Sequence, residues 1–125
     1  MSAGGFGTRQ WPVEIRLKTA DKILEIDFDD GRTFRLPAEY LRVESPSAEV
    51  KGHAPSQRKL VAGRRHVGIL EIETVGNYAL RIKFDDLHDT GIYTWNYLYE
   101  LGLNYEANWR RYLDELAGRG LSRDP

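Results

Sequence analysis

The chain has 125 residues, which is enough for one domain with a hydrophobic core. Its 18 Lys and Arg residues nearly balance its 19 Asp and Glu residues, so it has no overall attraction to nucleic acid or to a membrane surface. No cysteine is present, which excludes disulfides, thiolate metal ligands and a cysteine nucleophile.

The termini and the hydropathy pattern indicate the setting of the protein. Residues 1–10 are rich in glycine and contain neither the basic start nor the apolar stretch of a secretory signal, so we expect a flexible tail there. No run of 18 apolar residues could span a bilayer. We therefore expect a cytoplasmic protein with a single domain over residues 11–118 and a second flexible tail over residues 119–125.

The first half of the domain predicts a strand–turn–strand–helix unit. Apolar and polar residues alternate over residues 12–17, 24–28 and 33–36, which is typical of half-buried strands. Pro37 suits the start of a helix because it has no N–H to leave unpaired, and a short helix is predicted over residues 38–42. A long polar connection over residues 45–66 follows.

The second half repeats this pattern and adds a final helix. Strands are predicted over residues 67–75, 78–84 and 92–93. Thr94 is a suitable N-cap for a helix over residues 95–101, with Gly102 as its stop. Asn104 is predicted to cap a last amphipathic helix, whose apolar residues at helical spacing are Trp109, Tyr112, Leu113 and Leu116.

An internal similarity relates the two halves. The segment Leu24-Glu-Ile-Asp-Phe-Asp-Asp30 resembles Leu80-Arg-Ile-Lys-Phe-Asp-Asp86, and a Tyr-Leu pair follows each in the next helix. The sequence therefore predicts an α+β fold of small antiparallel sheets, made of two strand–turn–strand–helix units and a C-terminal amphipathic helix. His88 marks a difference between the two Asp-Asp turns.

His88 is the first candidate for chemistry, and three interpretations of it stay open. With Asp86 and Asp89 it could bind zinc or iron, with His53 or His66 as further ligands. It could act as a general base that Asp89 orients. It could also be a hydrogen-bonded structural histidine in a tight turn.

Two further features could bind a partner. The connection carries a local excess of basic side chains, which could bind an acidic partner, namely Lys51, His53, Arg58, Lys59, Arg64, Arg65 and His66. Tyr93 and Tyr97 belong to an aromatic-rich segment, and if they are exposed they would favour a partner surface. The balanced net charge makes nucleic acid an unexpected partner.

Several motifs in order carry a resemblance to a known family. They are Trp11-Pro-Val-Glu-Ile-Arg-Leu, Phe34-Arg-Leu-Pro-Ala-Glu-Tyr-Leu-Arg-Val-Glu-Ser-Pro-Ser-Ala-Glu-Val, Gly76-Asn-Tyr-Ala and Asp85-Asp-Leu-His-Asp-Thr-Gly-Ile-Tyr-Thr-Trp. Together they resemble the gamma-butyrobetaine hydroxylase N-terminal-like domain, also called domain of unknown function 971, in its free-standing bacterial form.

The resemblance implies a lost zinc site. In the hydroxylases this domain precedes an iron- and 2-oxoglutarate-dependent catalytic domain and holds zinc through three cysteines and a histidine. Carried over by motif, the cysteines fall on Ser45, Ser47 and Val50, and the histidine falls on His88. Serine and valine cannot replace thiolates around zinc, so we expect hydrogen bonds to hold the turn instead.

The resemblance also limits the expected activity. The chain has no His-x-Asp pair of the kind an iron triad needs, and kinship of fold does not supply activity. We expect a non-catalytic accessory or protein-interaction module, loosely linked to iron or cofactor metabolism, with no cofactor and with another protein as its partner. Arg64, Arg65, Tyr93 and Tyr97 are its predicted partner-binding residues. A metal-binding protein and an enzyme that uses His88 are the alternatives.

Overall fold

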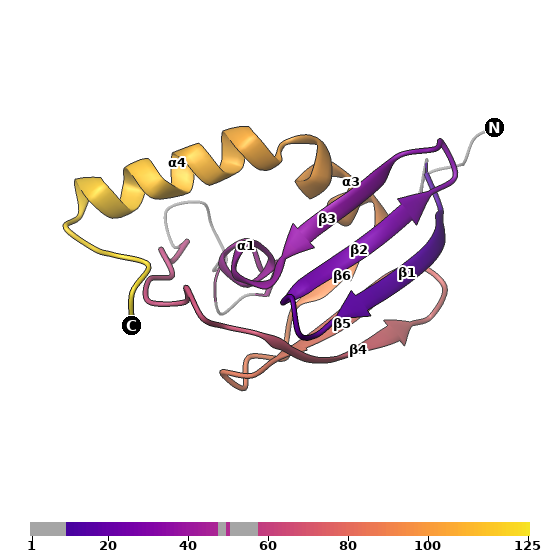
Figure 1. The fold of residues 1–125 in the computed structure, drawn as a ribbon, viewed down its shortest axis with the longest axis horizontal. Coiled ribbons are helices and arrows are strands. Elements are labelled where there is room, and N and C mark those ends of the chain that lie inside the picture. The colour runs from indigo at the N-terminus through magenta and orange to yellow at the C-terminus, as the bar shows by residue number, and fades with distance from the viewer. Residues whose placement is uncertain (1–9, 48–49, 51–57) are drawn as a thin grey trace.

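The computed structural model describes residues 10–47, 50 and 58–125. Within these residues the chain forms two three-stranded antiparallel sheets and helices beside them (Figure 1). The elements are β1 (Pro12–Lys18), β2 (Ile23–Phe28), β3 (Thr33–Pro37), α1 (Ala38–Val43), β4 (Ile69–Val75), β5 (Ala79–Phe84), β6 (Ile92–Thr94), α3 (Trp95–Leu103) and α4 (Tyr105–Gly118). The α+β class predicted from the sequence is confirmed.

Each of the two units forms one sheet, in which the three strands lie side by side in sequence order. The first sheet has the order β1-β2-β3 and the second has the order β4-β5-β6. The outer strand of each sheet, β1 or β4, carries one register shift, between Pro12 and Glu14 and between Ile69 and Glu71. The predicted pair of strand–turn–strand–helix units is therefore present, and even the bulges fall at matching places.

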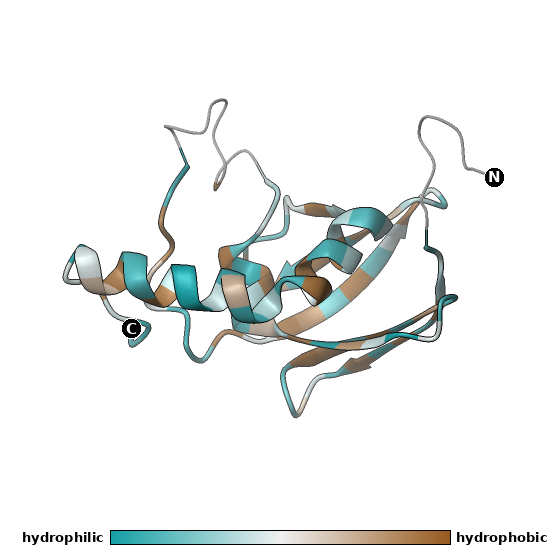
Figure 2. Ribbon diagram, turned by 90° about the horizontal axis from the view of Figure 1, so that it is seen from above, coloured by the Kyte–Doolittle hydropathy of each residue, from teal (hydrophilic) through white to brown (hydrophobic). Residues whose placement is uncertain are grey.

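One hydrophobic core joins the two sheets and the first two helices. Fully buried side chains from both sheets meet there, including Leu24, Ile26, Ile82 and Phe84, together with residues of α1 and α3. These strands alternate apolar and polar residues (Figure 2). Successive side chains of a strand point to opposite faces, so each sheet directs one face inward and leaves the other to water. Burial of this shared core is the main source of stability.

The second helix differs from the prediction at its end. The helix predicted to stop at Gly102 runs through it, because α3 ends at Leu103. A Cβ atom at Gly102 would lie 2.3 Å from the Phe34 ring. Glycine is present there because the ring packs directly on the helix backbone.

The last helix packs on a second, smaller cluster. Tyr112 and Leu116 of α4 are buried with Val43, and Trp109 and residues 60–62 pack around them. Asn104 precedes α4 as predicted, but its side chain does not cap that helix. Its Nδ2 instead donates to the Glu100 carbonyl at 3.0 Å and so closes α3.

The segment after α4, predicted as a flexible tail, has defined contacts. Arg123 donates to both carboxylate oxygens of Glu39 at 2.8 and 2.7 Å, and its guanidinium lies 5.2 Å from the centre of the Trp109 ring. The backbone of Gly63 and Arg65 donates to Ser122 and Arg123. The C-terminal segment thus fixes residues 63–65 next to the end of α1 (Figure 1).

Candidate functional site

The turn between β5 and β6 holds His88 by its own backbone. The N–H of Phe84 donates to the His88 carbonyl at 3.0 Å, and the N–H of Leu87 donates to the Phe84 carbonyl at 3.0 Å. The carboxylate of Asp86 accepts from the His88 N–H at 3.1 Å. Asp86 therefore organises the turn from within, as short acidic side chains do in tight turns.

A buried serine–histidine pair joins this turn to the segment after α1. Ser45 Oγ lies 2.9 Å from His88 Nε2, and the two residues are 0% and 7% exposed. Ser45 Oγ also accepts from the Ser47 N–H at 3.3 Å. The side chain of His88 is thus directed at the protein interior, where a hydrogen bond takes the place that the resemblance gives to zinc.

Two arginines bind the carboxylate of Asp86 from the other side. Arg42 Nε and Arg64 Nε both donate to Asp86 Oδ2 at 2.8 Å. Burial alone would raise the pKa of Asp86, but the hydrogen bonds from Arg42 and from the His88 N–H, with that from Arg64, lower it. Asp86 is therefore a carboxylate at neutral pH and ties α1, residues 58–66 and the turn together.

The structure gives the predicted metal ligands Asp86 and His88 different bonding partners. Asp86 faces Arg42 and Arg64, and His88 faces Ser45. Across the described residues, no group of three or more His, Cys, Asp and Glu side chains is arranged to hold a metal ion. Ser47 and Val50 are buried, at 5% and 3% exposure. Metal binding through His88, Asp86 and Asp89 stays a prediction, and His53 lies outside the described residues.

The hydroxyl groups of the two tyrosines predicted to bind a partner both donate to backbone carbonyls of this chain. Tyr93 is fully buried and its hydroxyl donates to the Leu41 carbonyl at 2.6 Å. It has no surface to offer, so its proposed partner role is wrong. Tyr97 is partly buried and donates to the Glu44 carbonyl at 2.5 Å. Burial raises the pKa of both hydroxyls, so both are protonated donors.

The predicted basic residues lie at the surface beside the turn. The side chains of Arg64 and Arg65 are 36% and 43% exposed. Arg65 pairs with Asp124 at 2.8 Å, and Arg58 lies 3.4 Å from Glu44. Lys51 lies outside the described residues. The Arg64–Asp86 bond brings together the basic segment and the turn, which are far apart in the sequence.

The internal repeat extends to hydrogen bonds between the two units. Tyr40 of α1 donates to the carbonyl of Leu101 at the end of α3, and Tyr97 of α3 donates to the carbonyl of Glu44 at the end of α1. The two turns are bound in the same reciprocal way. Asp30 accepts from Tyr99 of α3, and Asp86 accepts from Arg42 of α1. Each unit therefore holds the turn of the other.

The two units differ at one pair of equivalent positions, and this difference explains why only the turn of the second unit has the polar cluster, which we define as Arg42, Ser45, Asp86 and His88. The strand register pairs Leu24 with Leu36 and Leu80 with Tyr93, so Phe34 and Gly91 are equivalent. Phe34 fills its space with a ring that packs on Gly102. Gly91 has no side chain, and Ser45 takes up the space there, since its Oγ would lie only 2.5 Å from an added Cβ.

Arg42 and Gly91 were missed by sequence reasoning. Arg42 is one of many charged residues along the chain, and its role depends on Asp86, 44 positions later. Gly91 could be read as an ordinary turn glycine. The repeat itself was a signal for both, since an alignment of the two units sets Gly91 against Phe34 and Arg42 against Tyr99.

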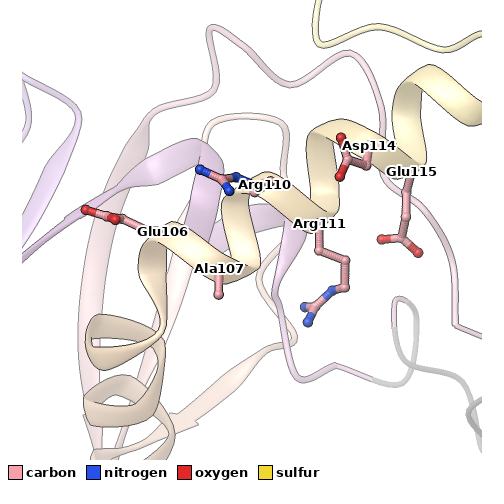
Figure 3. Close-up of a pocket in the computed structure, with 6 residues that line it drawn as sticks. All are labelled: Glu106, Ala107, Arg110, Arg111, Asp114 and Glu115. Carbon is pink, nitrogen blue, oxygen red and sulfur yellow. The ribbon is translucent and has the colours of Figure 1, made fainter.

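A separate hollow of about 690 Å³ lies along α4 (Figure 3). Its lining residues in the described part of the chain are Glu106, Ala107, Arg110, Arg111, Asp114 and Glu115. None of the predicted site residues is among them. Arg111 also reaches to within 3.6 Å of Glu44.

The fold and the site define a class: a small α+β domain in which two related units share one core and a buried serine–histidine pair fixes the turn between β5 and β6. The chain belongs to the family described as gamma-butyrobetaine hydroxylase-like, N-terminal, whose model matches residues 15–99. This confirms the family that the sequence resembles.

Solved structures support the same assignment. Two NMR solution structures match with a TM-score of 0.81 each, at 47% identity over 93% of this chain and 91% of that one, and at 42% over 100% and 92%. A crystal structure of an Acidithiobacillus ferrooxidans protein of unknown function, which belongs to the DUF971 family, matches at 42% identity over 73% of this chain and 91% of that one, with a TM-score of 0.62.

No curated protein matches the chain. In the part of the chain that the structure describes, no helix is both long and apolar enough to cross a membrane.

Proposed function

We propose that this chain is a non-catalytic protein-interaction module, whose working surface consists of residues 58–66 and the turn 85–91. The observation that carries the proposal is the bond of 2.8 Å between Arg64 and Asp86, which makes these two regions one surface. The turn beneath it is fixed by Ser45 and Arg42, so the surface is preorganised for binding.

The position of His88 supports a binding role over a catalytic one. A general base must lie within hydrogen-bond reach of a substrate proton. His88 is 7% exposed and its Nε2 is directed at Ser45. Its geometry suits a residue that positions the turn.

The charge of the surface suggests the chemistry of the partner. Over residues 58–66 and 85–91, the four basic side chains Arg58, Lys59, Arg64 and Arg65 outnumber the three carboxylates Asp85, Asp86 and Asp89 by one. Lys59 and Arg65 are exposed on the same segment. An acidic protein surface is the complementary partner. The link to iron or cofactor metabolism that the family resemblance implies belongs to this proposal as its broader setting.

The test is a pulldown with mass spectrometry on cells that express the chain. Wild type is compared with an Arg64→Glu/Arg65→Glu variant and with an Arg110→Glu/Arg119→Glu control, which makes the same charge change on exposed arginines of and after α4. We expect a specific protein to be captured by wild type and by the control, and to be lost with the first variant. Equal capture by all three, or capture of none, would contradict the proposal.

A further inference from the structure

Backbone hydrogen bonds on both sides of Arg64 fix its place beside the turn. The N–H groups of its neighbours Gly63 and Arg65 donate to two backbone carbonyls of the C-terminal segment (residues 119–125), each at 3.0 Å. Between them, the side chain of Arg64 extends to Asp86 and donates to its carboxylate at 2.8 Å. The arginine that joins the two parts of the proposed surface is thus held by a segment that belongs to neither part.

The C-terminal segment is attached to the rest of the fold mainly through the side chain of Arg123. No side chain of residues 119–125 belongs to either hydrophobic cluster. Arg123 donates to both carboxylate oxygens of Glu39, at 2.8 and 2.7 Å. The other ion pair of the segment, Asp124 with Arg65, is exposed to water on both sides and contributes little. The position of the segment therefore depends on one buried contact.

Glu39 of α1 makes this contact a strong requirement of the fold. Its side chain is 7% exposed, and within the described residues Arg123 is the cation that pairs with it. A buried carboxylate without a partner is unfavourable, so the folded state of α1 needs Arg123 at this place. The guanidinium carbon also lies 5.2 Å from the centre of the Trp109 ring, which adds a cation–π contact.

Both arginines that bind Asp86 therefore depend on α1. Arg42 belongs to this helix and reaches the carboxylate directly. Glu39, almost one turn earlier in the helix, acts on Arg64 through Arg123 and the backbone bonds of the C-terminal segment. The helix thus fixes the direct contact and the indirect one at the same time.

We infer that Glu39 and Arg123 are positioning residues of the interaction surface. Their ion pair holds the C-terminal segment in place, and this segment places Arg64 against the turn 85–91. Neither residue needs to touch the partner. This inference rests on the proposed function and adds how the surface is assembled.

The first arm of the test needs no partner and follows the Arg64 side chain itself. In the isotopically labelled full chain, exchange of the Arg64 Nε–H proton with water is measured by NMR in wild type and in Arg123→Gln. This exchange should become about tenfold faster or more in the variant, because Arg64 leaves Asp86 more often. Arg42 Nε–H donates to the same carboxylate oxygen from α1 and should keep its exchange rate.

The Arg42 signal separates positioning from a general loss of stability. If both protons exchange faster by the same factor, Arg123 supports the whole fold and the inference is wrong. It is also wrong if Arg64 exchanges as in wild type. Arg119→Gln, which removes an exposed guanidinium from the same segment, is the matched control and should change neither rate.

A second variant covers the case in which Arg123→Gln fails to fold because Glu39 is left unpaired. Glu39→Gln removes the buried charge instead, so it releases Arg123 with a smaller loss of stability. It should accelerate exchange at Arg64 as Arg123→Gln does. Arg123→Lys, which keeps the charge but loses the bidentate geometry, should have an intermediate effect. An Arg64 Nε–H that stays protected in Glu39→Gln would overturn the inference.

The last arm measures binding of the partner that wild type captures, and it separates this inference from the proposed function. Arg123→Gln and Glu39→Gln should weaken binding by about fivefold or more, because the surface is no longer preorganised, whereas Arg119→Gln should not change it. If Arg64→Glu/Arg65→Glu abolishes binding and Arg123→Gln does not weaken it, the surface stands and the positioning role is wrong. If Arg64→Glu/Arg65→Glu has no effect, the proposed function fails, while faster exchange at Arg64 still supports its placement by Arg123.

Discussion

At the scale of single residues, Gly91 determines where the polar cluster can form. A Cβ atom there would lie 2.5 Å from Ser45 Oγ, 3.2 Å from the Tyr93 ring and 3.3 Å from Pro46. Two of these neighbours, Ser45 and Tyr93, are fully buried and cannot easily move away. Even a methyl group at this position requires the cluster to move.

Gly91→Ala should therefore destabilise the protein by about 1–3 kcal/mol, the usual range for overpacking a core. Urea denaturation measures the change in the free energy of unfolding. Gly118→Ala is the control, since an added Cβ meets nothing within 4 Å at the end of α4. That variant should be neutral or slightly stabilising. Equal effects at the two positions would show that the space beside Ser45 is not closed.

The bond between Ser45 and His88 should be measurable as a coupling energy. A double-mutant cycle of Ser45→Ala and His88→Ala isolates it, and we expect a coupling of about 1 kcal/mol for one buried hydrogen bond. If this bond replaces a metal, a chelator leaves the melting temperature of wild type unchanged. A coupling near zero, or a melting temperature that falls with chelator, would contradict this account of the turn.

At the scale of elements, the outer face of the first sheet depends on charges paired across strands. Arg16 of β1 donates to both carboxylate oxygens of Asp27 on β2, at 2.9 and 2.8 Å, and to Glu25 at 2.6 Å. The hydrogen bonds from Arg16 and Thr33 lower the pKa of Asp27 to about 2. The ionised form of Asp27 thus stabilises the folded state.

The lowered pKa gives this contribution a definite pH dependence. It is complete above the ordinary pKa of 3.8 and is lost as the pH falls through about 2. Asp27→Asn should lower the melting temperature at pH 7, and its difference from wild type should shrink between pH 4 and pH 2. Asp114→Asn, on the exposed face of α4, is the control. A constant difference across this pH range would refute the role of the charge.

The reciprocal tyrosines should make the two units unfold together. Tyr40 and Tyr97 each donate to a carbonyl at the helix end of the other unit. Tyr97→Phe should cost about 1 kcal/mol, and Tyr40→Phe should cost more because Asn108 also donates to its hydroxyl at 3.0 Å. Burial raises the pKa of Tyr40 to about 12, so it stays a donor at neutral pH.

Guanidinium denaturation followed by tryptophan fluorescence and by circular dichroism tests this coupling. The two signals should give the same midpoint for wild type and for both variants. Tyr78→Phe, which alters a tyrosine that is 49% exposed, should have no effect. Separate midpoints for the two signals would show that the units unfold independently.

The elements that the sequence predicted correctly share one property: their signal is local. The strands alternate visibly, and the similarity of residues 24–30 and 80–86 identified both units. The errors arise where distant residues decide. The side of the sheet to which Tyr93 points, the packing of Phe34 on Gly102 and the contact of Arg123 with Glu39 all depend on tertiary structure. The position of Ser45 opposite His88 was predictable through the family resemblance.

At the scale of the whole molecule, the two units have the same scaffold but different surfaces. The first sheet covers its outer face with the charge network around Arg16, and its turn ends in Gly31. The second unit carries the turn whose Asp86 and His88 are bound by Arg42, Arg64 and Ser45. The proposed working surface belongs to this turn and to residues 58–66, and the charge network of the first sheet is not part of it.

Chemical-shift mapping tests this claim most directly. The captured partner is added to the isotopically labelled full chain, and amide shifts are followed residue by residue. The account predicts that the largest changes fall on residues 58–66 and 85–91, with the outer face of the first sheet undisturbed. Changes centred on that face or on the hollow along α4, with residues 58–66 and 85–91 unaffected, would contradict it.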